Sequence, residues 1–322
     1  MKIQTHARLI SVAATLGTAA LLLGTADLAH AQEPALPAGT GGTQGPATTG
    51  STELEGQGTM ATAKEVEELP EDPESLDATE FDLGAGAILN TGNSRSLAMT
   101  GTSNFRLRRK MHQASANLAG NYGKAATDKD GPWLDTTRNV QGRVRYDVFF
   151  AERWSAFVMA TMRNDVFQGL DYRLNVDPGI AFYAIPKKNH RLWFEAGYDF
   201  QYEIRTNGAI LAKDDAGNII LDDAGNTTRA LEKTDINHAA RLFAGYVNSV
   251  NERVNFTTGF EYLQSFLDGK RFRMNWDVGL STQIKERLAL STTFTLRYDN
   301  SPLPEVEQLD TITALQLTYR FF

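Results

Sequence analysis

The sequence predicts an all-β protein, a closed antiparallel transmembrane β-barrel of about 12 strands. Two patterns predict this fold. Apolar residues recur at every second position in a dozen segments, most of about 10–14 residues, and a tilted strand needs about 9–11 residues to cross a bilayer. The last segment, "DTITALQLTYRFF", places Leu315, Leu317, Tyr319 and Phe321 on one face of a strand. An apolar face with an aromatic end is typical of a strand that lies against lipid.

The first element, residues 1–31, is predicted to be a secretory signal peptide. Lys2 and Arg8 flank the start of the apolar run "LISVAATLGTAALLLG", and Ala29 and Ala31 supply small residues around a cleavage point. The run is too short for a membrane-spanning helix, which needs about 20 residues. We expect cleavage after Ala31, and therefore export from the cytoplasm.

The second element, residues 32–79, is predicted to be a disordered periplasmic linker. It is rich in Pro, Gly and Thr and then acidic, so it buries too little apolar surface to offset its ordering entropy. Eleven acids between residues 32 and 80 face a single lysine, whereas residues 81–322 are close to neutral. The acidity belongs to the linker, and a nucleic-acid partner is not expected.

The third element, residues 80–322, is the predicted barrel. Short, partly basic turns such as "IPKKNH" and "KER" alternate with longer loops, which is typical of outer-membrane barrels. The tight segments "NTGN" and "LDGK" are exceptions on the long-loop side. The twelve segments begin near Phe81, Arg95, Gln113, Thr137, Arg153, Tyr172, Arg191, Asn237, Arg253, Lys270, Arg287 and Leu309.

The alternative fold is a soluble sandwich, in which the charged faces would meet water and the apolar faces would form a core. The barrel is favoured for two reasons. Its charges are balanced, and its apolar faces carry aromatic residues near strand ends, where the membrane–water interfaces lie. Closure also pairs every strand edge, and the interior of a bilayer requires this.

The polar faces of the strands are predicted to line the lumen. They permit two interpretations: a narrow charge-lined pore for small polar solutes, or a plugged lumen whose ion pairs satisfy one another. Barrels of about eight strands are filled by side chains and barrels of 16–18 strands are open, so twelve strands leave the choice undecided. Inward positions also include Arg106, Arg191, Arg205, Arg241, Asp82 and Glu261. The predicted pore-lining residues are Arg143, Arg145, Arg163, Arg173, Arg271, Arg273, Arg297, Asp147, Asp165, Asp177, Glu195, Asp199, Glu203, Asp277 and Asp299.

Several segments resemble a known family. They are the "TGN" turn at residues 91–93, "RYD" at 145–147, "GLDYRLNVDPGIAFY" at 169–183 and "LALSTTFTLRYDNSP" near the end. The chain from Phe81 to Phe322 resembles the bacterial salt-induced outer membrane proteins, a domain-of-unknown-function family. The resemblance implies an outer-membrane barrel associated by name with salt stress, and it supplies no catalytic residues. Barrels of this kind carry a C-terminal assembly signal, which Tyr319, Phe321 and Phe322 would form here, with Phe322 one residue beyond the usual register.

The loop "KDDAGNIILDDAGNTTR" contains "DDAGN" twice. Asp and Asn oxygens at short spacing suit calcium, but the EF-hand spacing and its closing Glu are missing. A Gly-Asn hairpin that extends the flanking strands is the favoured interpretation. Cysteine is absent, and the mature chain has only His112, His190 and His238. We therefore expect no metal site, no cofactor and no catalytic set.

The leading functional hypothesis is a small pore or an envelope-stabilising barrel of a Gram-negative-type outer membrane, linked to salt or osmotic stress, with both barrel ends in the periplasm. The alternative is a surface binding module that uses the 206–234 loop. A barrel hydrolase is the third hypothesis, although no histidine is paired with a serine in a recognisable motif, and we do not expect an enzyme. The expected partners are outer-membrane lipids, the barrel assembly machinery and small solutes.

Overall fold

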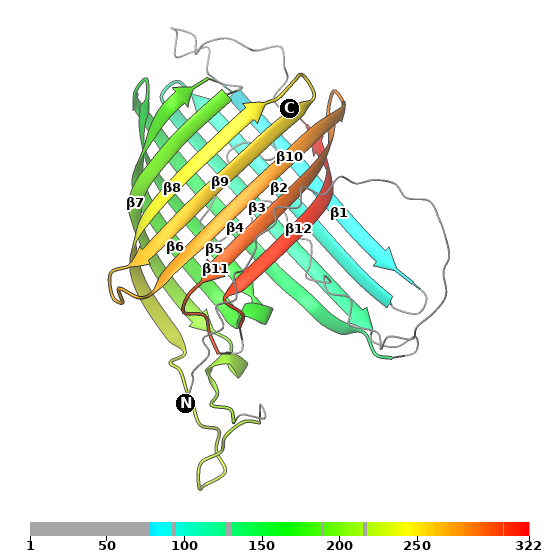
Figure 1. Cartoon of the computed structure of the whole chain (residues 1–322), viewed down its shortest axis with the longest axis vertical. Coiled ribbons are helices and arrows are strands. Elements are labelled where there is room, and N and C mark those ends of the chain that lie inside the picture. Colours follow the sequence, from blue (N-terminus) through cyan, green and yellow to red (C-terminus); the bar gives the residue numbers. More distant parts are fainter. Residues whose placement is uncertain are drawn as a thin grey trace, which may run out of the picture. The chain divides into compact units, whose positions relative to one another are not determined.

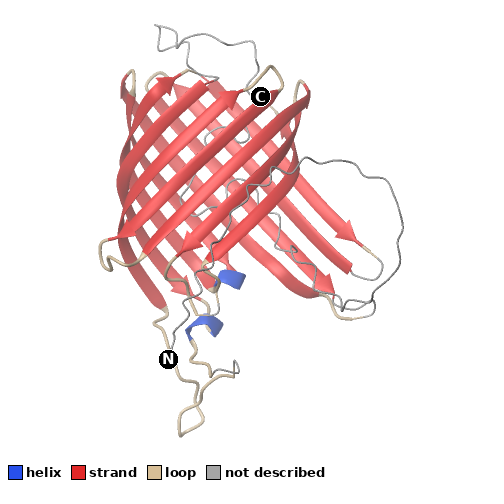
Figure 2. Ribbon diagram, in the orientation of Figure 1, coloured by secondary structure: helices blue, strands red, loops and turns tan. Residues whose placement is uncertain are grey.

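The computed structural model describes residues 78–91, 95–126, 131–187, 190–214, 218–304 and 306–321. The predicted signal peptide, the linker up to residue 77 and Phe322 lie outside these residues. Twelve strands and two short 3₁₀ turns make up the described part (Figures 1 and 2). They are β1 (Ala78–Asn90), β2 (Arg95–Arg109), β3 (His112–Ala126), β4 (Leu134–Ala151), β5 (Trp154–Asp165), η2 (Val166–Gln168), β6 (Leu170–Pro186), β7 (His190–Arg205), η3 (Gly208–Ile210), β8 (Thr234–Ser249), β9 (Val254–Ser265), β10 (Phe272–Lys285), β11 (Leu288–Asp299) and β12 (Leu309–Arg320).

The strands form one closed barrel in which each strand pairs antiparallel with its neighbours in sequence and β12 returns to β1. The predicted fold is confirmed, and every strand begins within three residues of its expected start. Both barrel ends, at Ala78 and Arg320, lie at the rim that carries the short turns, which we call the short-turn rim; the opposite end is the long-loop rim. No helix in the described part of the chain is long and apolar enough to span a membrane.

The two-residue period becomes an inside-out arrangement. On β12, Leu315, Leu317 and Tyr319 are 56%, 46% and 42% exposed, whereas Gln316 and Thr318 between them are buried. The same alternation runs along the other strands, so the apolar side chains face outward and the polar ones face the lumen. So large an apolar exterior is not expected of a soluble protein, and the closed barrel excludes the sandwich.

Aromatic side chains gather on the outer face near both rims. At the short-turn rim Phe81 and Phe321 lie with their ring centroids 5.4 Å apart, and Tyr319 lies 5.0 Å from Phe321. At the long-loop rim Phe272 lies between the rings of Tyr262 and Tyr298. Two aromatic girdles are the arrangement that anchors a barrel at the two surfaces of a bilayer.

The seam that closes the barrel is short. β1 and β12 are paired only from Asp82 to Ala85, opposite Arg320 to Leu317, whereas β1 and β2 are paired over the whole of β1. Beyond Ala85 β1 is hydrogen-bonded on one side only, and Figure 1 shows it diverging from β12 toward the long-loop rim. The wall is therefore least connected where its first and last strands meet.

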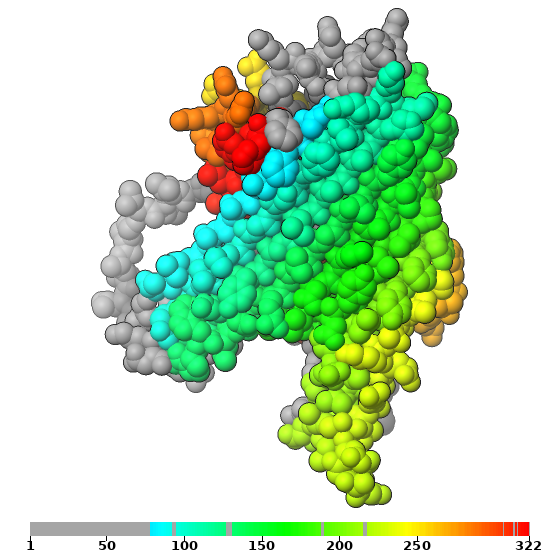
Figure 3. All heavy atoms as spheres, turned by 180° about the vertical axis from the view of Figure 1, so that it is seen from behind, coloured from blue at the N-terminus to red at the C-terminus, as the bar shows by residue number. Residues whose placement is uncertain are grey.

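The loop between β7 and β8 projects beyond the barrel (Figure 3, yellow-green). Its base is held by the Lys233 ammonium, which lies 2.9 Å from Asp171, and by a backbone hydrogen bond from Thr206 to Gly169. Further out, the bridge between Leu211 and Arg229 pairs its two arms. The bridges Lys213–Ile219 and Leu221–Thr227 each close a small hairpin around one "DDAGN" segment, so the hairpin interpretation holds for each copy of the repeat.

Candidate channel lumen

The strand parity places all fifteen predicted pore-lining side chains at the lumen. Most belong to β4–β10, and we call the inward side chains of these strands the charged wall. They form three levels between the rims. Arg145, Asp147 and Glu195 lie at the central level. Arg143, Asp177, Asp199 and Asp277 form the next level toward the long-loop rim. The remaining eight lie closest to that rim; they are Arg163, Arg173, Arg271, Arg273, Arg297, Asp165, Glu203 and Asp299.

At the central level, a network of ion pairs includes one pair that bridges strands that are not neighbours. Arg145 on β4 donates to Asp147 at 2.8 Å and, across β5 and β6, to Glu195 on β7 at 2.8 Å. Arg241 on β8 donates to the second Glu195 oxygen and to Glu261 on β9, each at 2.7 Å. Every one of these side chains is almost fully buried. These ion pairs satisfy one another along one side of the lumen.

The network can cross two strands because β6 carries small side chains there. Gly179 and Ala181 are the inward residues of β6 at this level. The Phe157 ring of β5 occupies the space over Gly179, where an added Cβ would come within 2.6 Å of it. The guanidinium of Arg145 lies 4.1 Å from the centroid of that ring. Small residues on one strand thus allow an aromatic layer on which the arginine rests.

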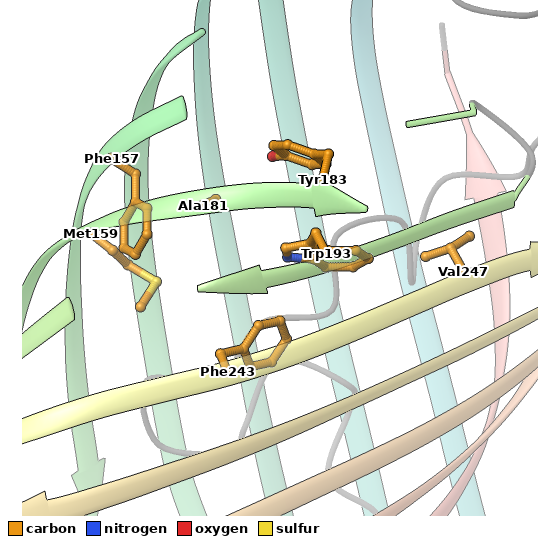
Figure 4. Close-up of a cluster of buried hydrophobic side chains, with 7 residues drawn as sticks. All are labelled: Phe157, Met159, Ala181, Tyr183, Trp193, Phe243 and Val247. Atoms are coloured by element: carbon orange, nitrogen blue, oxygen red, sulfur yellow. The ribbon is translucent and has the colours of Figure 1, made fainter. Parts of the chain in front are cut away.

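An apolar cluster inside the barrel was not predicted. Toward the short-turn rim, inward side chains of β5–β8 pack together instead of continuing the polar face (Figure 4). The Trp193 indole connects the cluster to the charges because it donates to Glu195 at 3.1 Å. Loss of alternation in "SAFVMAT" and "RLWF" is the sequence signal that could have revealed it. The cluster consists of Phe157, Met159, Ala181, Tyr183, Trp193, Phe243 and Val247.

The opposite side of the lumen is lined by small polar residues. Their side chains contact only adjacent strands; Ser291, for example, donates to Ser281 at 3.1 Å. Charged side chains on this side of the lumen lie near the rims; Arg320, for example, pairs with Asp82 at 3.1 Å. We call this surface the hydroxyl wall; its inward residues are Gly84, Thr100, Thr102, Ser291, Thr293, Thr295, Gln316 and Thr318.

Several buried polar atoms of both walls have no hydrogen-bond partner within the described chain. They include the hydroxyls of Thr100, Thr161 and Thr318. A buried polar group that lacks a protein partner is normally satisfied by water, since leaving it unpaired costs about 1–3 kcal/mol. These atoms mark positions at which the protein does not satisfy its own polar lumen.

Charge is densest toward the long-loop rim, where loops from several strands meet the lumen. Arg163 pairs with Asp165 at 2.6 Å, and Arg173 pairs with Glu203 at 2.6 Å. Arg273 lies 3.7 Å from Asp199. Arg271, Arg297 and Asp299 complete the predicted set at this end. Together with the β11–β12 loop, these side chains enclose a cavity of about 220 Å³.

The "DDAGN" carboxylates are used as turn caps. Asp222 accepts the backbone N–H groups of Ala224 and Asn226 at 2.9 and 2.8 Å, and Gly225 has a φ of 81°, which favours glycine. The backbone hydrogen bond from Asn226 lowers the pKa of Asp222. Asp214 accepts the N–H of Asn218 in the same way. Among the described residues no group of three or more His, Cys, Asp and Glu side chains could hold a metal ion.

The three histidines of the described residues are on the outer face, and each contacts a tyrosine hydroxyl of the adjacent strand. His112 lies 2.7 Å from the hydroxyl of Tyr146, and His190 lies 3.2 Å from that of Tyr246. His238 contacts the hydroxyl of Tyr198. These contacts resemble interface pairs more than a serine–histidine arrangement, so they lend no support to the hydrolase hypothesis.

The family described as "Protein of unknown function, DUF481" matches residues 83–321. The curated proteins contain no match. Among solved structures, the NanC porin is 11% identical with a TM-score of 0.39, covering 75% of this chain and 96% of its own. An outer membrane channel from Pseudomonas putida F1 is 11% identical with a TM-score of 0.42, covering 79% and 100%. The translocator domain of autotransporter NalP from Neisseria meningitidis is 10% identical with a TM-score of 0.39, covering 76% and 87%.

Proposed function

This chain belongs to the DUF481 family of proteins of unknown function, and we propose that its barrel is an outer-membrane channel for small polar solutes. The observation that carries the proposal is the polar lumen of the closed barrel. Buried hydroxyl groups without a hydrogen-bond partner among the described residues line it on both walls. A barrel that served only to stabilise the envelope would be expected to satisfy these groups or to replace them with apolar packing.

The location follows from the outer face. An apolar exterior between two aromatic girdles matches the hydrocarbon layer of a bilayer and its two interfaces. The lipids of the outer membrane would contact this face, and the assembly machinery would recognise the C-terminal Tyr319, Phe321 and Phe322. Both barrel ends would then be periplasmic, with the β7–β8 loop at the cell surface.

The path of the solute would follow the hydroxyl wall. Side chains of the charged wall are joined across several strands, so moving one of them breaks ion pairs on others. Side chains of the hydroxyl wall are short and contact only their neighbours. The smallest rearrangement that opens a continuous passage is therefore on this side of the lumen.

Single-channel recording tests the proposal. The full-length protein, purified from membranes and inserted into a planar bilayer, should give small discrete current steps, and Arg273→Glu should shift the ion selectivity toward cations. Protein that inserts fully but passes no current above the bare bilayer would contradict the channel.

Cysteine substitution tests the path, since the chain contains no native cysteine. Thr293→Cys on the hydroxyl wall should react with a charged methanethiosulfonate reagent and lose most of its current. Thr161→Cys on the charged wall is the matched control and should be affected much less. The reverse order would move the path to the charged wall.

A surface binding module is the second candidate, favoured by the exposed apolar tip of the β7–β8 loop. Ile219, Ile220 and Leu221 are 46%, 43% and 55% exposed there, outside the barrel. Deleting Asn207–Lys233 should abolish the binding of a surface partner and leave the barrel folded. A role in salt stress is a further prediction, and the growth of a deletion strain at high osmolarity would test it.

A further inference from the structure

We propose that the cavity at the long-loop rim binds a small organic anion, a carboxylate or phosphate carried on an apolar body. This inference deepens the proposed channel function and rests on it, because the cavity opens into the same lumen. The observations that carry it are an excess of guanidinium groups, arginine donors that the protein leaves unused and an apolar surface on one side of the cavity.

The walls of the cavity carry more positive than negative charge. Four carboxylates line it, those of Glu203, Asp299, Glu307 and Asp310, against six arginines, so the lining itself has an excess of two guanidinium groups. Behind the lining, Asp165, Asp199 and Asp235 lie within 4 Å of four of these arginines. A cation would meet this excess directly, whereas an anion would offset it. The six arginines are Arg163, Arg173, Arg205, Arg271, Arg273 and Arg297.

Not all of the arginine donors are used by the protein. Glu203 accepts from both Arg173 and Arg205, and Arg205 also lies 3.3 Å from Asp235. Arg271 reaches Asp235 at 3.0 Å through Nη1, but its buried Nε has no partner in the described chain. These contacts satisfy part of the set and leave donors available.

Arg273 makes one long ion-pair contact. It lies 3.7 Å from one oxygen of Asp199, beyond hydrogen-bond distance, and its buried Nη2 has no hydrogen-bond partner among the described residues. The other Asp199 oxygen accepts from Asn175 at 2.6 Å, which holds the carboxylate in place. An oxyanion in the cavity would give the Arg273 guanidinium the bidentate partner that it lacks.

The opposite surface of the cavity is apolar. Pro302, Leu303, Pro304 and Val306 of the β11–β12 loop line it, and Leu231 of the β7–β8 loop joins them. Two prolines within three residues stiffen this surface. A bare inorganic anion would leave it wet, whereas a ring or short alkyl chain would cover it.

The volume limits the size of the anion. About 220 Å³ corresponds to the liquid volume of roughly seven water molecules at about 30 Å³ each. A single ring with one acidic group fits such a space, and a polymer or a lipid with full acyl chains does not. The proposed ligand class is therefore a monocyclic or short-chain organic acid or its phosphate equivalent.

Equilibrium dialysis of the full-length protein in detergent tests the inference. Radiolabelled benzoate represents the anion with an apolar body, inorganic phosphate the anion alone, and benzyl alcohol the neutral body. Benzoate should bind with one site per chain and outcompete both others. Arg273→Gln should weaken it about tenfold or more, the loss expected for a charged hydrogen bond. Arg253→Gln, at the short-turn rim, removes the same charge and should bind normally.

Leu303→Glu gives a second variant that lies in a loop and leaves the strands intact; it should abolish benzoate binding by placing an acid at the apolar surface. Benzyl alcohol that binds as tightly as benzoate, phosphate that binds in its place, or full binding by both variants would overturn the inference. Bilayer recordings separate the two proposals: benzoate binding without current contradicts the channel alone, and current without benzoate binding contradicts the anion site alone.

Discussion

The charged wall and the hydroxyl wall enclose one lumen but are built differently. Side chains of the charged wall reach across two intervening strands, as Arg145 does to Glu195. Those of the hydroxyl wall end at their neighbours, as Ser291 does at Ser281. The length of the inward side chains therefore distinguishes the two walls. Long side chains of the charged wall form ion pairs between distant strands, whereas side chains of the hydroxyl wall can move without breaking such ion pairs.

The charged wall carries an energetic risk that the hydroxyl wall avoids. Taking paired ions out of water costs several kcal/mol per ion, and the pairs recover this only when all partners are present. Glu195 is the critical member because it accepts from both Arg145 and Arg241. Losing it leaves two buried guanidinium groups without their shared carboxylate.

The largest predicted effect is that of Glu195→Ala, which should lower the free energy of unfolding by about 3–5 kcal/mol. Thr293→Ala on the hydroxyl wall should cost about 1 kcal/mol or less, because a small hydroxyl is lost without stranding a charge. Urea titration of the protein in lipid vesicles, followed by tryptophan fluorescence, measures both values. Equal losses would show that the two walls do not differ in this way.

A smaller effect is predicted for Gly179→Val, which tests how β6 lets the network cross. Its Cβ would come within 2.6 Å of Phe157 and 2.8 Å of the Ala196 carbonyl oxygen, so the substitution should cost about 1–3 kcal/mol. Gly101→Val is the matched control, since a Cβ there meets nothing within 4 Å. The same unfolding measurement compares them, and a harmless Gly179→Val would remove β6 from the explanation.

A functional effect without a large loss of stability is predicted at the border of the two walls. Arg143 on β4 donates to Asn117 on β3, which joins the charged wall to the small polar strands. Arg143→Gln keeps a donor but removes a cation beside the proposed path, so the permeability ratio should shift toward cations. Reversal potentials in a salt gradient measure the shift, with Arg253→Gln at the short-turn rim as the control. An unchanged ratio would place the path away from Arg143.

The fold was predictable because its signal is local. Alternation assigns each side chain to a face, and one residue of slip would move Leu315 and Leu317 from the outside to the lumen. The same parity predicted which charges line the lumen. It could not predict that Arg145 meets Glu195, because that contact joins strands three places apart and depends on the curvature of the closed sheet and on Gly179.

The apolar cluster escaped prediction for a related reason. Near the short-turn rim both faces of β5 and β7 are apolar, as at Phe157 beside Val158 and Trp193 beside Phe194. Alternation has no information where the two faces have the same character. The cavity at the long-loop rim also depends on loop positions, which strand periodicity does not specify.

The last prediction concerns geometry at the seam, which lies within the hydroxyl wall. Ala85 and Leu317 are a register pair on the outer face, so cysteines at both positions should form a disulfide on mild oxidation. If β1 and β12 stayed paired beyond Ala85, Leu89 and Thr313 would also face each other on the outer face. The strands are not paired there, so cysteines at these two positions should cross-link slowly. Electrophoretic mobility without reductant reports both yields. Equal and rapid cross-linking would mean that β1 and β12 pair along their full length, and the hydroxyl wall would then be as firmly closed as the charged one.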